Sequence, residues 1–371
     1  MHFRLSEEQQ MLRDMVRDFV SAQVTPNAAQ WASGIPRAVF AALGDLGLLG
    51  IDIDEAYGGA GMGLMAATLA LEELAVGDGG LAQGVMTHGL LAGGYLARYG
   101  TETQKKLYLP RLVSGERLWT WAGGSSESGA ASARAVRTDA GWRLEGSLPS
   151  VALADLADEA VVVVASGPSS ASAFMVSGDN WSAGTGTSLG CRSARAAEMV
   201  FSDDPIDDAQ RLGRQGTALE DEPAILTRAH IGRAAMAVGV ARAAAREAVV
   251  YAGERAQFGK PIAQFQAVQW MIADSATELD AARLLCHRAA ALVDAGQDAR
   301  MEAAMARRFA ARVAREVSDR AVQIHGGYGY TTEYSVERFW RDAKQLSVGE
   351  GTNDALQRRT ISQVLLGRGD R

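Results

Sequence analysis

The chain has 371 residues, which is enough for two or three domains around a large core. Hydrophobic residues make up 47% of it and charged residues 22%, an ordinary composition for a globular protein. The net charge of −7 argues against nucleic acid as the main partner, because that binding depends on Lys and Arg neutralising phosphates.

The two cysteines, Cys191 and Cys286, form no C-x-x-C pattern and no disulfide framework, which fits a reducing compartment. The first ten residues are polar and charged, unlike a signal peptide, and no apolar run approaches the ~20 residues of a membrane span. The five histidines lack the spacing of a metal site. The sequence therefore predicts a cytoplasmic protein with no membrane partner and no metal.

Residues 1–115 are predicted to form an all-helical domain. Apolar residues recur with a helical period between residues 5 and 24, and Ser6, followed by two Glu and a Gln, is a plausible helix cap. Glycine turns separate the further helices that we expect at 36–46, 63–75, 85–99 and 103–113.

The residue composition and its pattern change near Trp119. Short runs rich in β-branched and aromatic residues alternate with Gly, Pro, Asn and Asp, which indicates strands. Asp139 to Gly141 is a reasonable hairpin turn. Residues 116–217 are therefore predicted to form a middle β domain.

Long stretches rich in alanine and arginine return in residues 218–371. We expect helices at 223–255, 261–295, 298–325 and 354–366, and their small residues permit close helix packing. This region is predicted to be a C-terminal helical bundle.

Residues 323–359 contain two glycine-rich turns with a charged, aromatic segment between them. Glycines in such turns admit positive φ and let a ligand approach the main chain. The second turn carries one acid, Glu350, between two glycines. Taken alone, Glu350 would be read as a loop acid that faces water.

The same segment resembles the C-terminal signature of the acyl-CoA dehydrogenases, flavoenzymes that read close to Q-I-hydrophobic-G-G-x-G-Y, E-Y-x-V-E-R-x-x-R-D-A-K and Y-E-G-T. The matching residues are Gln323, Gly326, Gly327, Gly329, Tyr330, Glu333, Tyr334, Val336, Glu337, Arg338, Arg341, Asp342, Ala343, Lys344, Glu350, Gly351 and Thr352. So many matches at fixed spacing are highly specific. The turn at 46–63 and the segment at 99–116 also resemble the family, so the resemblance covers essentially the whole chain.

The resemblance implies an α+β, mainly α fold like that of the acyl-CoA dehydrogenases. It would have an N-terminal helical domain, a middle β-barrel-like domain and a C-terminal four-helix bundle. It also implies FAD as the cofactor and Glu350 as the catalytic base. The residues that it places at the cofactor are Arg255, Gln257, Phe258 and Gln266, which would reach the FAD of a neighbouring subunit, Gln323, Gly326 and Gly327 on the adenine side, and Thr352 and Asp354 over Glu350.

The middle domain departs from the family pattern. Alignment through the predicted hairpin places Thr120 at the cofactor and Ser126 at the substrate, whereas alignment from residues 114–116 shifts this motif by four positions. The family Trp and Thr beside the flavin ring correspond to Ser150 and Ala152. Without the resemblance, residues 123–129 would be read as an unliganded loop.

The predicted function is FAD-dependent α,β-dehydrogenation of an acyl thioester, on coenzyme A or on an acyl-carrier protein. Electrons would pass to an electron-transfer flavoprotein or to oxygen, and the chain would form a homo-oligomer, a dimer or a tetramer. Because Ser150 and Ala152 replace an aromatic ring and a hydroxyl, an alternative stays open. It is a flavin-poor member that performs non-redox proton abstraction or dehydration, or a partner-dependent subunit with an incomplete flavin site.

Overall fold

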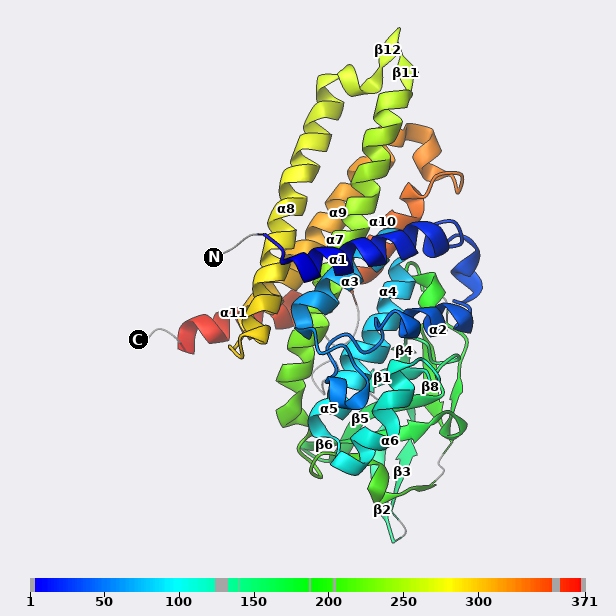
Figure 1. Cartoon of the computed structure of the whole chain (residues 1–371), viewed down its shortest axis with the longest axis vertical. Helices are drawn as coiled ribbons and strands as arrows, with labels where there is room; N and C mark the ends of the chain where they lie inside the picture. The colour runs from blue at the N-terminus through cyan, green and yellow to red at the C-terminus, as the bar shows by residue number, and fades with distance from the viewer. Residues whose placement is uncertain are drawn as a thin grey trace.

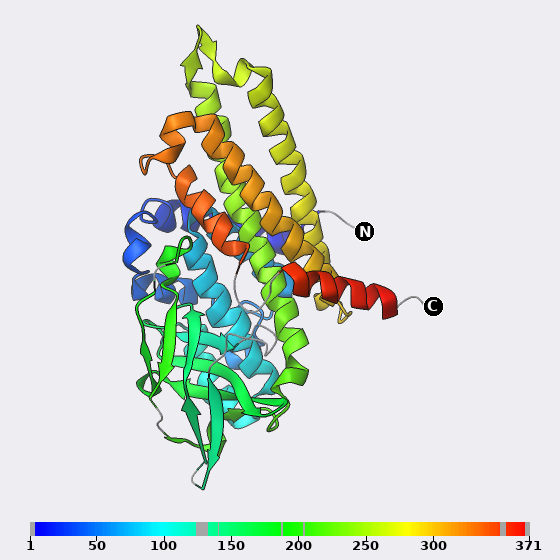
Figure 2. The same ribbon diagram turned by 180° about the vertical axis from the view of Figure 1, so that it is seen from behind.

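The computed structural model describes residues 4–123, 133–139, 141–186, 188–202, 205–348 and 354–367. The N-terminal helices and the β sheets form one half of the molecule, and the long C-terminal helices extend away from them (Figures 1 and 2). A small hairpin crowns the far end of these helices, and α11 projects from their side (Figure 2).

The N-terminal part is helical, as predicted. Helix α1 (Glu7–Phe19) starts at Ser6, whose hydroxyl accepts from the Gln9 N–H at 3.2 Å while the Gln9 side chain accepts from the Ser6 N–H. The following elements are η1 (Val20–Val24), η2 (Gln30–Ser33), α2 (Arg37–Asp45), η3 (Glu55–Tyr57), α3 (Gly63–Gly77), α4 (Gly79–Val85), η4 (Met86–Gly93), α5 (Gly94–Tyr99) and α6 (Glu102–Val113).

The prediction of one regular α-helix at 85–99 is wrong in one respect. The first half of this segment is the π-helical element η4, and only the second half is the α-helix α5. All of η4 is buried. At Gly89 an added Cβ would lie 2.3 Å from the Leu49 carbonyl oxygen, so the backbones touch there and only glycine fits. Apolar periodicity does not distinguish a π turn from an α turn, so the sequence pattern could not show this change.

The middle region folds into two sheets. The larger has the order β10-β6-β5-β2-β3-β9, with β1 pairing in parallel with β5, and the smaller has the order β4-β8-β7. The strands are β1 (Trp119–Gly123), β2 (Arg134–Thr138), β3 (Gly141–Glu145), β4 (Ser147–Val151), β5 (Glu159–Gly167), β6 (Ser170–Ser177), β7 (Trp181–Ala183), β8 (Ala197–Phe201), β9 (Pro205–Ile206) and β10 (Arg211–Leu212), with short turns η6 (Gly178–Asn180), η7 (Arg192–Ala194) and η8 (Asp208–Gln210). Thr138 pairs with Gly141, which confirms the predicted hairpin turn.

The C-terminal part is built on α7 (Ala218–Glu254), a helix of 37 residues that packs on α3, α8 and α9. The remaining elements are β11 (Ala256–Gln257), β12 (Lys260–Pro261), η9 (Ile262–Gln264), α8 (Gln266–Asp294), α9 (Arg300–His325), η10 (Gly326–Tyr330), α10 (Val336–Leu346) and α11 (Asp354–Gly367). An added Cβ at Gly239 of α7 would lie 2.2 Å from the Glu72 carbonyl oxygen of α3, so the two helices approach to backbone contact.

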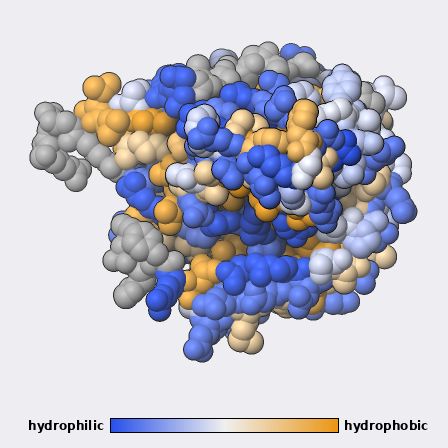
Figure 3. All heavy atoms as spheres, turned by 90° about the horizontal axis from the view of Figure 1, so that it is seen from above, coloured by the Kyte–Doolittle hydropathy of each residue, from blue (hydrophilic) through white to orange (hydrophobic). Residues whose placement is uncertain are grey.

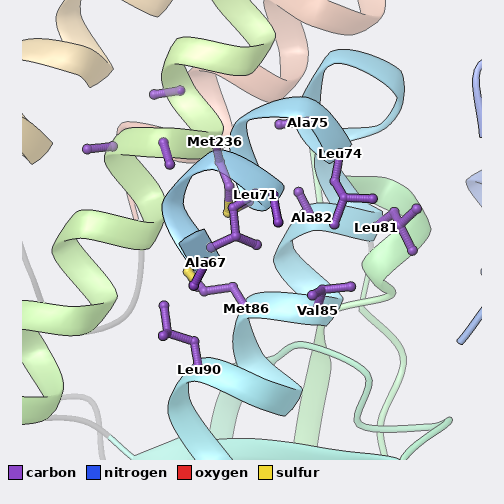
Figure 4. Packing of buried hydrophobic residues seen from close by; sticks show 14 of the residues in the cluster. Ala67, Leu71, Leu74, Ala75, Leu81, Ala82, Val85, Met86, Leu90 and Met236 are labelled. Carbon is purple, nitrogen blue, oxygen red and sulfur yellow. The ribbon is translucent and has the colours of Figure 1, made fainter. Parts of the chain in front are cut away.

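The two helical regions share one hydrophobic core. Figure 4 shows how side chains of α3, α4 and η4, among them Leu71, Val85 and Met86, meet Met236 of α7. The sheets enclose a second core around Trp142 and Phe174. None of the described helices is both long and apolar enough to cross a membrane.

Candidate cofactor and active site

The antiparallel hairpin β11–β12 stands at the tip of the bundle (Figure 1). Its two turn residues, Phe258 and Gly259, have φ values of 53° and 78°. Two left-handed residues fit a tight two-residue hairpin, but an aromatic residue rarely adopts this backbone. Phe258 is also 92% exposed. Single exposed rings are common on protein surfaces, but a non-glycine residue held in this backbone conformation is a candidate functional position.

Arg255 joins this hairpin to the glycine-rich turn η10. Its N–H donates to the Tyr251 carbonyl at 2.8 Å, and its own carbonyl accepts from the Ile262 N–H at 2.8 Å. The Arg255 guanidinium carbon lies 5.7 Å from the centroid of the Tyr328 ring. This cation–π contact holds the guanidinium beside the turn.

The backbone of that turn is open. Gly326 has φ 60° and ψ −135°, a conformation that non-glycine residues avoid. An added Cβ at Gly326 or at Gly327 would meet no described atom within 4 Å. A ligand can therefore approach the main chain here, as the glycine pattern predicted.

The predicted cofactor residues of the bundle thus gather at one end of the molecule. Arg255, Gln257, Phe258, Gln266, Gln323, Gly326 and Gly327 are all exposed there. Figure 3 looks onto this end, where hydrophobic patches interrupt a largely hydrophilic surface. Such a mixed surface suits a ligand with an aromatic base and a charged pyrophosphate.

Thr120 lies elsewhere, in β1 of the larger sheet. Its side chain is fully buried, and its hydroxyl donates to the Ala152 carbonyl oxygen at 2.6 Å. Ser150, two residues before, is exposed and has φ 56°. The register of β4 with β8 shifts between Leu148 and Val151, so this left-handed residue sits in a bulge. The role of Thr120 at the cofactor stays a prediction.

Glu350, Ser126 and Thr352 lie outside the described residues, and so does the side chain of Asp354. Their predicted roles therefore stay predictions.

One pocket, of ≈ 780 Å³, lies between α8, α9 and α11. Ser347, directly after α10, and Gln357 of α11 line it. Its lining also includes Arg307, Arg308, Arg312, Arg315 and Arg358. So many guanidinium groups give the pocket a potential that favours anions.

The second pocket, of ≈ 490 Å³, lies between α7 and α11 and is lined by His230 and Thr360 among others. His230 is buried, and its Nε2 has no hydrogen-bond partner. Burial, together with the charges of Arg307 and Arg233, lowers the pKa of His230 to about 3. The imidazole is therefore neutral at physiological pH. The preceding residue is Ala229, so this position of α7 supplies no carboxylate.

Four aromatic rings pack together beside the hairpin, those of Tyr251, His325, Tyr328 and Tyr334. This packing was not predicted from the sequence. Tyr251 precedes Arg255 by one helical turn, and this spacing could have singled it out. No local pattern shows its contact with His325, because the two residues lie on different helices, α7 and α9.

Comparison with known proteins agrees with this architecture. The model of the acyl-CoA dehydrogenase N-terminal domain matches residues 6–116, and that of the acyl-CoA dehydrogenase C-terminal domain matches residues 223–366. The chain is 34% identical to the caffeyl-CoA reductase–Etf complex subunit CarC of Acetobacterium woodii, over 97% of this chain and 99% of that protein.

Two solved structures show the same fold. Butyryl-CoA dehydrogenase of Megasphaera elsdenii matches with a TM-score of 0.93 and 31% identity, over 99% of this chain and all of that one. A glutaryl-CoA dehydrogenase of Mycobacterium smegmatis in complex with FADH2 matches with a TM-score of 0.91 and 26% identity, over 99% and 97% of the two chains. The predicted resemblance and fold are confirmed, and the chain belongs to the acyl-CoA dehydrogenase family.

Proposed function

We propose that this chain catalyses the FAD-dependent α,β-dehydrogenation of an acyl thioester, with Glu350 as the base that removes the α-proton. One observation carries the proposal. A chain that matches this family over its whole length also gathers Arg255 and the open Gly326–Gly327 backbone at one exposed site. Both features suit the adenine and pyrophosphate half of FAD.

The described residues fit that half of the cofactor. The planar Arg255 guanidinium can make paired, charge-assisted hydrogen bonds to a pyrophosphate. The bare main chain at Gly326 and Gly327 can approach an adenine closely, and Gln323 stands one helical turn earlier. When bound, FAD supplies the hydride acceptor that no side chain can provide.

The protein's own part in the chemistry is proton removal. The α-proton of a thioester is weakly acidic, so the reaction needs a positioned base, and general bases typically contribute ~10²–10⁴ in rate. Glu350 holds the position of the family's base. A few members of the family instead place the base on the helix that corresponds to α7, but the residue at that position here is Ala229, which is no acid. The backbone N–H of Glu350 is the chain's candidate donor to the thioester oxygen, where negative charge develops.

A homo-oligomer, a dimer or a tetramer, is part of the proposal. The separation of Thr120 from Arg255 within one chain supports it. Gly232 of α7 packs on Met86 of η4, which borders the β1 strand that carries Thr120. The ~23 helical residues from Gly232 to Arg255 span about 35 Å, too far for one dinucleotide. We therefore propose that a second copy of the chain completes each site.

We assign coenzyme A as the thioester carrier, since the relatives are named for coenzyme A thioesters. An electron-transfer flavoprotein is the proposed electron partner in preference to oxygen, because the CarC relative is named as a subunit of an Etf complex. A cytoplasmic location is consistent with the two free, buried cysteines.

The second candidate function is the flavin-poor, non-redox one. The observation that favours it is the middle domain, where Ser150 replaces an aromatic wall and the buried Thr120 hydroxyl already donates to the Ala152 carbonyl. The family's aromatic ring and hydroxyl are replaced by Ser150 and Ala152. Each replacement would weaken flavin binding by roughly 1 kcal/mol.

The visible spectrum of the purified protein separates the two. The proposal predicts a flavin band near ~450 nm that bleaches anaerobically when acyl-CoA thioesters of graded chain length are added. Colourless protein that takes up no flavin on reconstitution would favour the non-redox reading. Bound flavin that no thioester bleaches would keep the cofactor but reject the dehydrogenase.

A further inference from the structure

We propose that four rings, those of Tyr251, His325, Tyr328 and Tyr334, form a positioning element for the dinucleotide half of the cofactor site. We call these rings the aromatic cluster. The inference rests on the proposed function, and it goes beyond it by naming what sets the geometry between the Arg255 guanidinium and the Gly326–Gly327 backbone.

The aromatic cluster is closely packed. The Tyr251 and His325 rings stack with their centroids 4.2 Å apart and an interplanar angle of 22°. The Tyr334 ring meets both edge-on, at 5.5 Å from Tyr251 and 5.2 Å from His325. Tyr328 meets Tyr334 at 5.9 Å. Each such pair contributes roughly 0.5–1.5 kcal/mol beyond its buried area.

The His325 ring is fixed within this cluster. Because a carbonyl can only accept, Nδ1–H donates to the Ala321 carbonyl oxygen at 2.8 Å. The other nitrogen, Nε2, is buried without a hydrogen-bond partner. Burial lowers the pKa of His325, so the ring stacks on Tyr251 in its neutral form. One tautomer and one ring orientation are thus selected.

The aromatic cluster connects directly to the groups that would hold the cofactor. Tyr251 lies one helical turn before Arg255 and accepts the Arg255 N–H at its carbonyl. His325 is the residue before Gly326, and Tyr328 lies under the Arg255 guanidinium. The stack between α7 and α9 therefore sets the distance between two ligand-binding segments that are remote in sequence.

Because the aromatic cluster lies at the end of the bundle, a substitution there can change ligand binding without unfolding the protein. Helices α7 and α9 pack on each other, and the core that the two helical regions share contains many other residues of both helices. Removing one ring at the end of the bundle should loosen the end without unfolding the rest. The variant should then lose affinity only for ligands that extend into the part of the site that would hold the adenine half of FAD.

The test compares two flavins. FAD carries the adenosine monophosphate half and FMN lacks it, so their dissociation constants for the apoprotein, measured by flavin fluorescence quenching, report on that half separately. The variants are Tyr251→Leu, which removes the stack, and Tyr251→Phe, which keeps it. Phe174→Leu is the matched control, because it deletes one ring of a buried aromatic pair in the sheet core.

We expect Tyr251→Leu to weaken FAD binding about tenfold, the loss of one well-placed charge-assisted hydrogen bond, and to leave FMN binding within about twofold. Tyr251→Phe should restore the wild-type ratio, and Phe174→Leu should not change it. If Tyr251→Leu left both dissociation constants unchanged, or raised them by the same factor, the inference would be overturned and the proposed function would stand. A wild-type protein that binds neither flavin would overturn the proposed function as well.

Discussion

Three histidines, His88, His230 and His325, are buried, and burial lowers the pKa of each. The clearest case is His88 in η4. Its Nδ1 accepts from the Trp119 N–H at 3.0 Å, so its Nε2–H must donate to the Leu112 carbonyl at 2.9 Å. The neutral ring joins α6 to β1 and thereby fixes the start of the strand that carries Thr120.

This geometry predicts a pH dependence of stability. Burial lowers the pKa of His88 to about 4, below its ordinary value of 6.5. The unfolded chain therefore takes up the proton first, and the stability that His88 provides above pH 6.5 is lost as the pH falls towards 4. Between pH 7 and pH 5 this loss amounts to about 2 kcal/mol.

Comparison with His88→Gln isolates the effect, because glutamine can both donate and accept but does not titrate. Urea unfolding at pH 7 and pH 5 should show the stability advantage of the wild type over His88→Gln shrinking by about 2 kcal/mol. Other groups, such as Asp342 with a pKa raised to about 6, cancel in this difference. A constant advantage at both pH values would contradict the account.

At the scale of elements, a cluster of charges around two buried carboxylates, Glu72 and Glu73, joins four helices. Glu72 of α3 accepts from Arg242 of α7 at 2.7 Å and from Arg283 of α8 at 3.1 Å. Its neighbour Glu73 accepts from Arg242 and also from Arg17 of α1. Although burial opposes ionisation of Glu72, His287, Arg242 and Arg283 together lower its pKa to about 2.

The cluster predicts that Glu72→Gln is destabilising. The variant takes a buried carboxylate away from Arg242 and Arg283, which are 24% and 26% exposed and keep Glu73 and Asp280 as partners. We therefore expect a cost of about 1.5–3 kcal/mol, the range of a hydrogen bond to a charged group. The stability that ionised Glu72 contributes is present above pH 4.5 and is lost as the pH falls towards 2. Thermal and urea unfolding near neutral pH measure the cost directly.

The matched control is Glu220→Gln, which breaks the exposed Glu220–Arg214 pair. Exposed pairs contribute little, so this variant should stay within about 0.5 kcal/mol of the wild type. Equal effects of the two substitutions would show that burial does not determine the contribution of the Glu72 cluster.

Local sequence patterns predicted helices, strands and turns better than they predicted the contacts between these elements. The capped start at Ser6, the helices and the hairpin turn before Gly141 follow from residues close in sequence, and the structure contains them. Strand order, the π turn at η4 and the stack of Tyr251 on His325 depend on residues far apart, which periodicity does not encode. For the site, the motif matches found the exposed hairpin end and included Tyr334, but they did not show that its ring packs with those of Tyr251, His325 and Tyr328.

At the scale of the whole molecule, Arg255 directly follows the C-terminal end of α7, the long helix that joins the two halves, whereas Thr120 lies in β1 of the larger sheet (Figure 1). This separation supports the proposed site that copies of the chain share. Such a site also gives a reason for Phe258, an exposed aromatic residue in a strained turn at the far end of the bundle.

We therefore predict that Phe258→Gly weakens self-association. Glycine adopts the left-handed turn without strain, so the hairpin should fold at least as well, while the exposed ring is removed. Sedimentation velocity should show the wild type as a dimer or tetramer and the variant shifted to smaller species at micromolar concentration. Met11→Gly, which removes an exposed apolar side chain of α1, is the control for general surface effects, with its helix cost of about 1 kcal/mol. A monomeric wild type would contradict the shared site.

The most direct test of the central claim is anaerobic flavin bleaching by an acyl-CoA in Glu350→Gln, beside Glu333→Gln. Both substitutions remove one negative charge, and Glu333 is an exposed loop acid in the same C-terminal segment. We predict that Glu350→Gln keeps its flavin band but bleaches at least ~10²-fold more slowly than the wild type, the typical contribution of a general base. The Glu333→Gln variant should bleach at close to the wild-type rate. Bleaching of Glu350→Gln at the wild-type rate would contradict the assignment of the base.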